Sequence, residues 1–298
     1  MTETEVFEEH RSLLFSVAYR MLGTAVDAED IVQDAWLRWS GSDRSNIDDP
    51  KAYLIRIVTN TAIDRLRSAQ VRRESYVGPW LPEPMLTSPD VADDVELAES
   101  VSLAMLVVLE TLSPLERAVF VLREVFGFSH ADVAATLDRS EASVRQVAHR
   151  ARLHVAKRRP RFTPDRAEQR RVTEEFLAAA LGGDLDRLMA VLAPDVVLVS
   201  DGGGKRTAAQ RPILGSVKVA RFIGSIGQRP YAGIPIEGME IRPADINGLP
   251  AGIVYSGEEV ITVFSMEVVD GRIKTVHLVA NPDKLGAISE GRELTLGR

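Results

Sequence analysis

The chain of 298 residues contains no cysteine. Disulfide bridges, zinc sites built on thiolates and cysteine nucleophiles are therefore excluded together. The first ten residues are acidic and lack the apolar core of a signal peptide. The longest apolar stretch, residues 103–109, stops at Glu110 and falls well short of membrane-spanning length. From these absences we expect a cytoplasmic protein with no membrane contact, no bound metal and no cofactor.

Charge is distributed unevenly along this acidic chain, whose net charge is −7. Residues 77–100 contain no basic residue, six acidic residues and four prolines, a composition typical of a linker. Within it, residues 80–84 (WLPEP) are too apolar to be only a spacer. Residues 139–161 are the opposite, with eight Lys or Arg and one acidic residue. A basic stripe on an acidic protein indicates a local surface for nucleic acid.

The same basic stretch follows the pattern of a helix-turn-helix. Ser129 is placed to cap a short first helix, with Asp132 in its first turn, and Ser140 to cap a second helix after a tight connection at Asp138 and Arg139. We expect the first helix to pack through Ala131, Val133, Ala134 and Leu137, and the second through Val144, Val147, Ala148 and Ala151.

Two interpretations of this pattern stay open from the helices alone. Pairs of short amphipathic helices occur in many helical domains, and a basic face is often simply solvated. The polar side of the second helix, however, carries residue types that read base edges in the major groove. Together with the concentrated positive charge, this favours DNA binding.

The whole sequence divides into four segments. We expect an all-helical domain at 1–76, a linker at 77–100, a second helical domain at 101–161 and an α+β domain at 165–292. The last segment begins with helices around a Gly-Gly break and continues with five β-rich stretches, which predict a curved antiparallel sheet. Asp270-Gly271 between two of these stretches is a strong signal for a two-residue hairpin turn.

The first 160 residues resemble bacterial sigma factors of the extracytoplasmic-function group. DAEDIVQDAWLRW (27–39) is similar to the region 2 helix that docks on the polymerase β′ subunit, and KAYLIRIVTNTAIDRLR (51–67) to the helix that opens and reads the −10 element. Residues 112–152 are similar to region 4, which reads the −35 element. The resemblance implies a promoter-specificity subunit whose partners are the core polymerase, through β′ and β, and promoter DNA.

The resemblance also assigns candidate residues to each role. It implies polymerase contacts from Asp30, Gln33, Asp34 and Leu37, which share an acidic and amide face. It places Arg56, Asn60, Arg65 and Arg67 at the −10 element, where phosphate contacts offset the cost of base flipping. It places Arg139, Ser143, Arg145, Gln146, His149, Arg150 and Arg152 at the −35 element. For each set, ordinary solvated charge is the alternative.

Residues 168–290 are similar to the SnoaL-like, nuclear-transport-factor-2-like cone, and the combination resembles a sigma factor subfamily with this domain fused. Three motifs carry that resemblance, and in the subfamily the extension is thought to regulate the sigma factor in cis. We expect the cone to clamp the linker, with Lys205 meeting Glu83. The motif residues assigned to this contact are Trp80, Leu81 and Glu83 of WLPEP, Asp201, Gly202, Gly203, Gly204 and Lys205 of DGGGK, and Asn281, Asp283 and Lys284 of NPDKL.

A second hypothesis is a SnoaL-type isomerase, cyclase or ligand sensor fused to a DNA-binding module. That fold hosts enzymes with an Asp/His pair, and His277 lies on the last expected strand, with Asp195 and Asp201 near an earlier one. A single strand histidine is more often a core residue, so we expect no enzyme. A small ligand in the C-terminal cavity stays possible under either hypothesis.

Overall fold

The computed structural model describes residues 2–43, 47–73, 75–88, 95–158, 165–226 and 238–294. Arg159 and Arg161 of the basic stripe lie outside these ranges. The chain forms two compact units: Met1–Glu74 with Met105–Arg159 and Leu294–Arg298, and Ser75–Ala104 with Pro160–Glu293. The two expected helical domains therefore share one unit, and the linker belongs to the other unit, with the α+β domain.

The helical unit begins with three helices that follow the sequence signals closely. Thr2 caps the first helix in a capping box with Glu5, and Gly23 ends it at a φ of 72°. The Asp49 side chain accepts a hydrogen bond from the Ala52 amide, so Pro50 lies in the first turn of the third helix. These helices are α1 (Glu3–Leu22), α2 (Ala25–Ser40) and α3 (Pro50–Arg73).

The second half of the helical unit contains the helix-turn-helix. Ser129 and Asp132 form the expected capping box, Asp138 takes a left-handed φ of 51° in the connection, and Ser140 caps the second helix. The second helix buries the four expected residues, whereas Ala131 of the first helix is exposed and Thr136 is buried instead. The elements are α6 (Leu103–Glu110), α7 (Pro114–Phe120), the π-helical turn η2 (Val121–Val125), α8 (His130–Leu137) and α9 (Glu141–Ala156).

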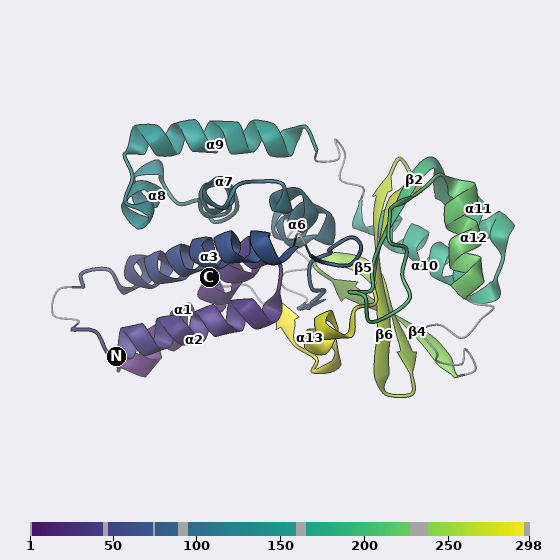
Figure 1. Cartoon of the computed structure of the whole chain (residues 1–298), viewed down its shortest axis with the longest axis horizontal. Helices are drawn as coiled ribbons and strands as arrows, with labels where there is room; N and C mark the ends of the chain where they lie inside the picture. Colours follow the sequence, from purple (N-terminus) through teal and green to yellow (C-terminus); the bar gives the residue numbers. More distant parts are fainter. Residues whose placement is uncertain are drawn as a thin grey trace. The chain divides into compact units, whose positions relative to one another are not determined.

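The C-terminal unit packs helices on one face of a sheet, as Figure 1 shows for α10, α11 and α12. Its helical elements are α5 (Val95–Val101), α10 (Arg166–Gly182), α11 (Leu185–Val191), α12 (Ser216–Ile226), η3 (Pro282–Lys284) and α13 (Gly286–Ser289). Its strands are β1 (Leu86–Thr87), β2 (Leu192–Asp201), β3 (Ile213–Leu214), β4 (Met239–Ile246), β5 (Leu249–Ser256), β6 (Glu259–Val269) and β7 (Arg272–Val279). The short β8 (Glu293–Leu294) lies at the boundary of the two units.

The sheet is mixed rather than purely antiparallel. Its strands follow the order β3-β2-β7-β6-β5-β4-β1, and β2 pairs with β7 in parallel, with Val199 opposite His277. The Asp270-Gly271 turn joins β6 to β7 with positive φ at both residues, as the sequence predicts. The linker contributes β1, which pairs with β4 through Leu86 and Ile246. The linker thus forms part of the sheet.

No helix among the described residues combines the length and the apolarity needed to cross a membrane.

Candidate DNA-reading surfaces and a linker clamp

The residues expected at the −35 element lie along α9, except Arg139 in the connection before it, and all of them except the half-buried Ser143 are exposed. Arg145 forms an ion pair with Glu141, one helical turn earlier. Arg150 lies 3.9 Å from Glu116. A hydrogen bond from Ser113 lowers the pKa of Glu116, and the nearby charge of Arg150 acts in the same direction. The helix therefore presents Gln146, His149 and its arginines on an accessible surface, as reading a major groove requires.

The four residues expected at the −10 element lie on α3, and the side chains of Asn60, Arg65 and Arg67 have partners within the helical unit. Arg65 forms ion pairs with Asp27 at 3.0 Å and Asp30 at 2.8 Å. Arg67 pairs with Asp64 one turn earlier. Asn60 donates to the Thr136 carbonyl oxygen of α8 at 3.1 Å. Arg56 is exposed and lines a groove with residues of α8.

The expected polymerase-docking face is the outer side of α2. Gln33, Asp34 and Leu37 are exposed there, and Leu37 leaves 60% of its surface accessible, which is unusual for a leucine. Asp30 is also exposed but is engaged with Arg65. An acidic and apolar surface of this kind suits a partner that is basic at its rim.

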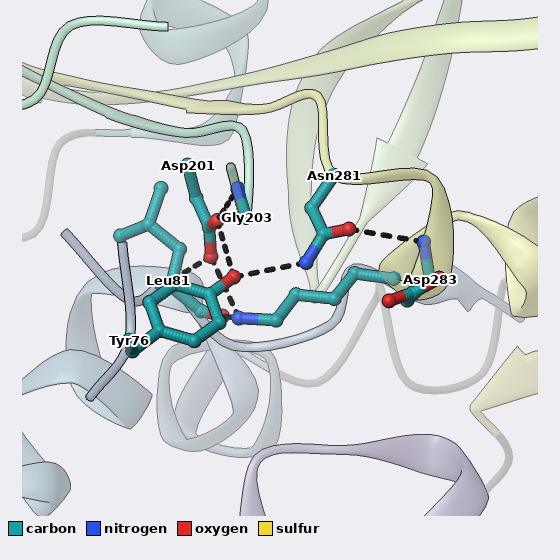
Figure 2. Close-up of polar contacts among 7 residues, drawn as sticks. Tyr76, Leu81, Asp201, Gly203, Asn281 and Asp283 are labelled. Carbon is teal, nitrogen blue, oxygen red and sulfur yellow. Dashed lines mark hydrogen bonds and ion pairs between the residues drawn. The ribbon is translucent and has the colours of Figure 1, made fainter. Parts of the chain in front are cut away.

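The linker contacts the C-terminal domain through a buried carboxylate at the end of β2. Asp201 is fully buried and accepts hydrogen bonds from the Tyr76 hydroxyl at 2.6 Å, the Leu81 amide at 2.8 Å and the Gly203 amide at 3.0 Å. Lys284 lies 2.6 Å from the same carboxylate. Figure 2 shows these groups converging on Asp201. Because Leu81 of the linker and Tyr76, directly before the linker, supply two of the donors, we call this cluster the linker clamp.

Lys284 completes the clamp from the C-terminal side. Its ammonium donates to the Leu81 carbonyl oxygen at 2.5 Å and lies 4.1 Å from the ring centre of Trp80 and 5.0 Å from that of Tyr76. A buried ammonium with a carboxylate, a carbonyl and two aromatic faces has its charge compensated on every side. Burial and the hydrogen bond to Asp201 raise the pKa of Tyr76, which therefore stays a neutral donor.

Two glycines of the loop after β2 allow other segments to approach the loop closely. A Cβ on Gly203 would lie 2.3 Å from the Asn281 side chain, and one on Gly204 would lie 3.2 Å from Val77. Gly202 instead faces its own loop, 2.2 Å from the Arg206 carbonyl oxygen.

The expected pair of Lys205 with Glu83 is not the one found. Lys205 bonds to Asp283 at 2.6 Å, near the surface, and Glu83 is buried. The lysine that binds the linker is Lys284, because the tail folds back and brings its side chain under the linker.

Sequence reasoning missed two parts of the clamp. Tyr76 was not singled out, although its hydroxyl joins Asp201 to the Asn281 amide at 2.9 Å. The β4–β5 turn was also missed: Asn247 accepts from the Met85 amide at 3.0 Å and donates to the Val101 carbonyl oxygen at 2.9 Å. The Asn-Gly dipeptide between two strands was an available signal for the turn.

Among the described residues of the C-terminal domain, His277 and the two candidate acids do not come together as the second hypothesis requires. Buried apolar side chains such as Phe176, Leu198 and Met266 pack between the helices and the sheet. His277 is buried on the opposite face of β7 from its core neighbours Val276 and Leu278. Desolvation by burial lowers its pKa, so the imidazole stays neutral.

Neither candidate acid forms a pair with this histidine. Asp195 binds Lys274 at 2.5 Å near the surface, and Asp201 belongs to the clamp. Among the described residues, no group of three or more His, Asp or Glu side chains is placed to hold a metal.

Comparison with known proteins identifies the helical segments. The family model Sigma-70 region 2 matches residues 6–72, and Sigma-70, region 4 matches residues 102–155. The ECF RNA polymerase sigma factor SigJ of Mycobacterium tuberculosis is 40% identical over 99% of this chain and 98% of its own length. The probable ECF sigma factor SigI of the same species is 33% identical over 93% of this chain and 92% of its own.

The fold agrees with this likeness over nearly the whole chain. The crystal structure of M. tuberculosis SigJ superposes with a TM-score of 0.75 at 38% identity, covering 95% of this chain and 98% of that one. Two sigma-70 regions in this order define a transcription initiation factor rather than an enzyme. The chain belongs to the ECF RNA polymerase sigma factors, whose partners are the core polymerase and promoter DNA.

Proposed function

We propose that this sigma factor is regulated in cis by its C-terminal domain, which holds the linker between the two promoter-reading regions. The observation that carries the proposal is the buried contact of Asp201 and Lys284 with both backbone groups of Leu81. The linker also adds β1 to the sheet of that domain. A linker fixed at these points restricts the relative positions that the two regions can take, and its release widens them.

Within this function we assign the finer contacts as follows. The exposed face of α2 around Asp34 docks on the β′ subunit. The N-terminal half of α9, with Arg145, Gln146 and His149, reads bases of the −35 element, and Arg150 holds backbone phosphates. The side of α3 with Arg56 and Asn60 contacts the −10 element. Exposure and charge support the first two assignments.

We further propose that a small molecule releases the clamp from outside the cone. A hollow of about 390 Å³ lies between Val77 and Gly78 of the linker and the loop from Gly202 to Gln210. A ligand in this hollow would touch the linker and the loop together, which is the requirement for shifting the balance between held and released states.

The test is promoter-directed transcription with purified core polymerase and a matched pair of variants. Lys284→Met removes the buried ammonium of the clamp, whereas Lys274→Met removes an exposed ammonium that pairs with Asp195 in the same domain. We expect K284M to change transcript yield severalfold and K274M to leave it unchanged.

Two further variants bear on the proposal. Gly203→Ala should act in the same direction as K284M, because a Cβ there displaces Asn281. Deletion of the chain after about residue 165 should also alter transcription. If K284M, Gly203→Ala and the deletion all transcribe at the wild-type level from the same promoter, regulation through the linker is wrong.

A further inference from the structure

The hollow between the linker and the loop after β2 has a positively charged wall. Among the described residues that line it, Lys205 and Arg206 are cationic and none is acidic. The other lining residues are small or carry uncharged polar groups, such as Thr207 and Gln210. A concave surface with this charge attracts anions and disfavours cations. Its volume of about 390 Å³ lies in the range of small-molecule sites.

This wall is held in place by bonds of the loop to itself and to β6. The Lys205 and Arg206 amides both donate to the Gly202 carbonyl oxygen, at 2.9 and 3.0 Å. The Arg206 guanidinium donates to the Ile261 carbonyl oxygen of β6 at 2.9 Å and pairs with Glu259 at 2.5 Å. Because the loop is already ordered, an anion can bind without first paying the entropy of ordering it.

Lys205 is less firmly held than Arg206. Its ammonium lies 2.6 Å from the Asp283 carboxylate, and more than half of each side chain is exposed, 56% and 60% respectively. An ion pair this open to water contributes little to stability, because solvent screens it and two mobile side chains must be ordered. A phosphate or carboxylate group in the hollow can therefore replace Asp283 as the partner of Lys205.

Asp283 lies on the short turn η3 that also carries part of the linker clamp. The next residue is Lys284, whose ammonium binds the linker. The Asp283 amide donates to the Asn281 side chain at 3.1 Å, and Asn281 donates to the Tyr76 hydroxyl at 2.9 Å (Figure 2). An anion bound to Lys205 leaves the Asp283 carboxylate without its cation and repels it. Displacement of η3 then weakens the hold of Lys284 on the linker.

We propose that the hollow binds a small multivalent oxyanion through Lys205, and that Lys205 exchanges Asp283 for a phosphate or carboxylate group of this ligand when the clamp opens. Both groups accept several charge-assisted hydrogen bonds, so they share the chemistry that the wall recognises. The inference rests on the proposed regulation through the linker clamp. It adds the class of the ligand and the ion pair on which the ligand acts.

Binding is measured by isothermal titration calorimetry on the full chain, at constant ionic strength. The two probes are pyrophosphate and citrate, which carry several negative charges on phosphate and on carboxylate groups. We expect one site per chain for at least one probe. Tighter binding of pyrophosphate assigns a phosphorylated ligand, and tighter binding of citrate assigns a polycarboxylate. If neither probe binds, the proposed class of ligand is wrong.

Three variants distinguish exchange at Lys205 from general attraction of anions. Lys205→Gln should weaken binding about tenfold, because it removes a charged donor. Lys274→Gln removes an exposed ammonium that pairs with Asp195 in the same domain, and it should bind as wild type does. Asp283→Asn removes the competitor for Lys205 and should strengthen binding about threefold. Equal weakening in K205Q and K274Q, or weaker binding in D283N, would overturn the proposal.

Hydrogen exchange measures whether the anion opens the clamp. The Leu81 amide donates to the Asp201 carboxylate at 2.8 Å, so its exchange rate reports the hold on the linker. We expect a saturating concentration of the bound probe to accelerate this exchange severalfold in the wild-type chain. The same concentration should have no effect in K205Q. An unchanged rate in the saturated wild-type protein would refute the exchange of partners at Lys205.

Failure of this inference and failure of regulation through the linker give different results. If neither probe binds while K284M alters transcription, the clamp regulates the sigma factor but its ligand is not an oxyanion. If a probe binds and accelerates exchange at Leu81 while promoter-directed transcription stays unchanged, the oxyanion site stands and the regulatory role of the clamp is wrong.

Discussion

Replacing Asp201 by alanine is expected to destabilise the C-terminal domain more than replacing its partner Lys284 by methionine. Both residues are buried, so each substitution leaves the other charge without its counter-ion. The two costs differ because the remaining hydrogen bonds differ. After Lys284→Met, the carboxylate still accepts from the Tyr76 hydroxyl and from the amides of Leu81 and Gly203.

The expected losses of stability follow from the number of hydrogen bonds that remain after each substitution. Breaking a buried ion pair costs about 3–5 kcal/mol when the remaining charge is left alone. Three retained donors should bring the cost of K284M to about 2–3 kcal/mol. D201A leaves the buried ammonium without its counter-ion and three donors without an acceptor, so its cost should be about 5 kcal/mol. The exposed pair of Lys274 and Asp195 should show no measurable effect in K274M.

Urea unfolding followed by tryptophan fluorescence measures this order. The chain has three tryptophans, and only Trp80 belongs to the C-terminal unit, so a Trp36→Phe, Trp39→Phe background leaves one reporter beside the Lys284 ammonium. Hydrogen exchange of the Leu81 amide gives a second reading, since this amide is protected by Asp201 alone among the bonds described. Equal losses for the two variants, or losses below about 1 kcal/mol for both, would refute the reasoning.

Three further predictions concern other parts of the chain. Arg145→Ala should relax discrimination at one base of the −35 element by roughly 1–3 kcal/mol, whereas Arg150→Ala should weaken binding on all sequences; equal, sequence-independent losses would remove Arg145 from base reading. Asp34→Arg should reduce affinity for core polymerase while circular dichroism shows an intact fold; wild-type affinity would exclude this face of α2. Burial lowers the pKa of His277, so the unfolded chain binds its proton more readily, and stability should fall as the pH drops through 6.5. His277→Leu should flatten that part of the stability profile, and an unchanged slope would assign the acid sensitivity to other groups.

Much of the fold could be predicted because its signals are local. Ser129, Asp132 and Ser140 cap their helices with bonds to amides three residues away, so the helix-turn-helix is encoded within one short segment. The Asp270-Gly271 turn is likewise fixed by the backbone freedom of two neighbours. The strand pairing of the sheet was harder to predict from the sequence. The parallel pairing of β2 with β7 joins strands about eighty residues apart, and no local sequence pattern indicates it.

The candidate site was predictable as a set of motifs but not as a set of partners. The motifs WLPEP, DGGGK and NPDKL do meet, yet the sequence suggested Lys205 and Glu83 where the fold joins Lys284 to Asp201. Two adjacent residues of the tail, Asp283 and Lys284, point to different neighbours because η3 turns one outward and the other under the linker. Of these two adjacent residues, Asp283 therefore forms an ion pair near the surface and Lys284 forms a buried one.

The sequence by itself determined the class of protein, because its motifs resemble those of a known family. It also determined the main helices and strands, because these depend on side-chain periodicity and on caps within a few residues. Only the tertiary structure decided that the linker is part of the C-terminal sheet, that Asn60 faces Thr136 and that Asp201 loses all contact with water. These contacts depend on which segments, far apart in the sequence, pack together and exclude water from the surface between them. Burial turns an ordinary carboxylate and an ordinary lysine into a clamp, and burial is a property of the packed chain.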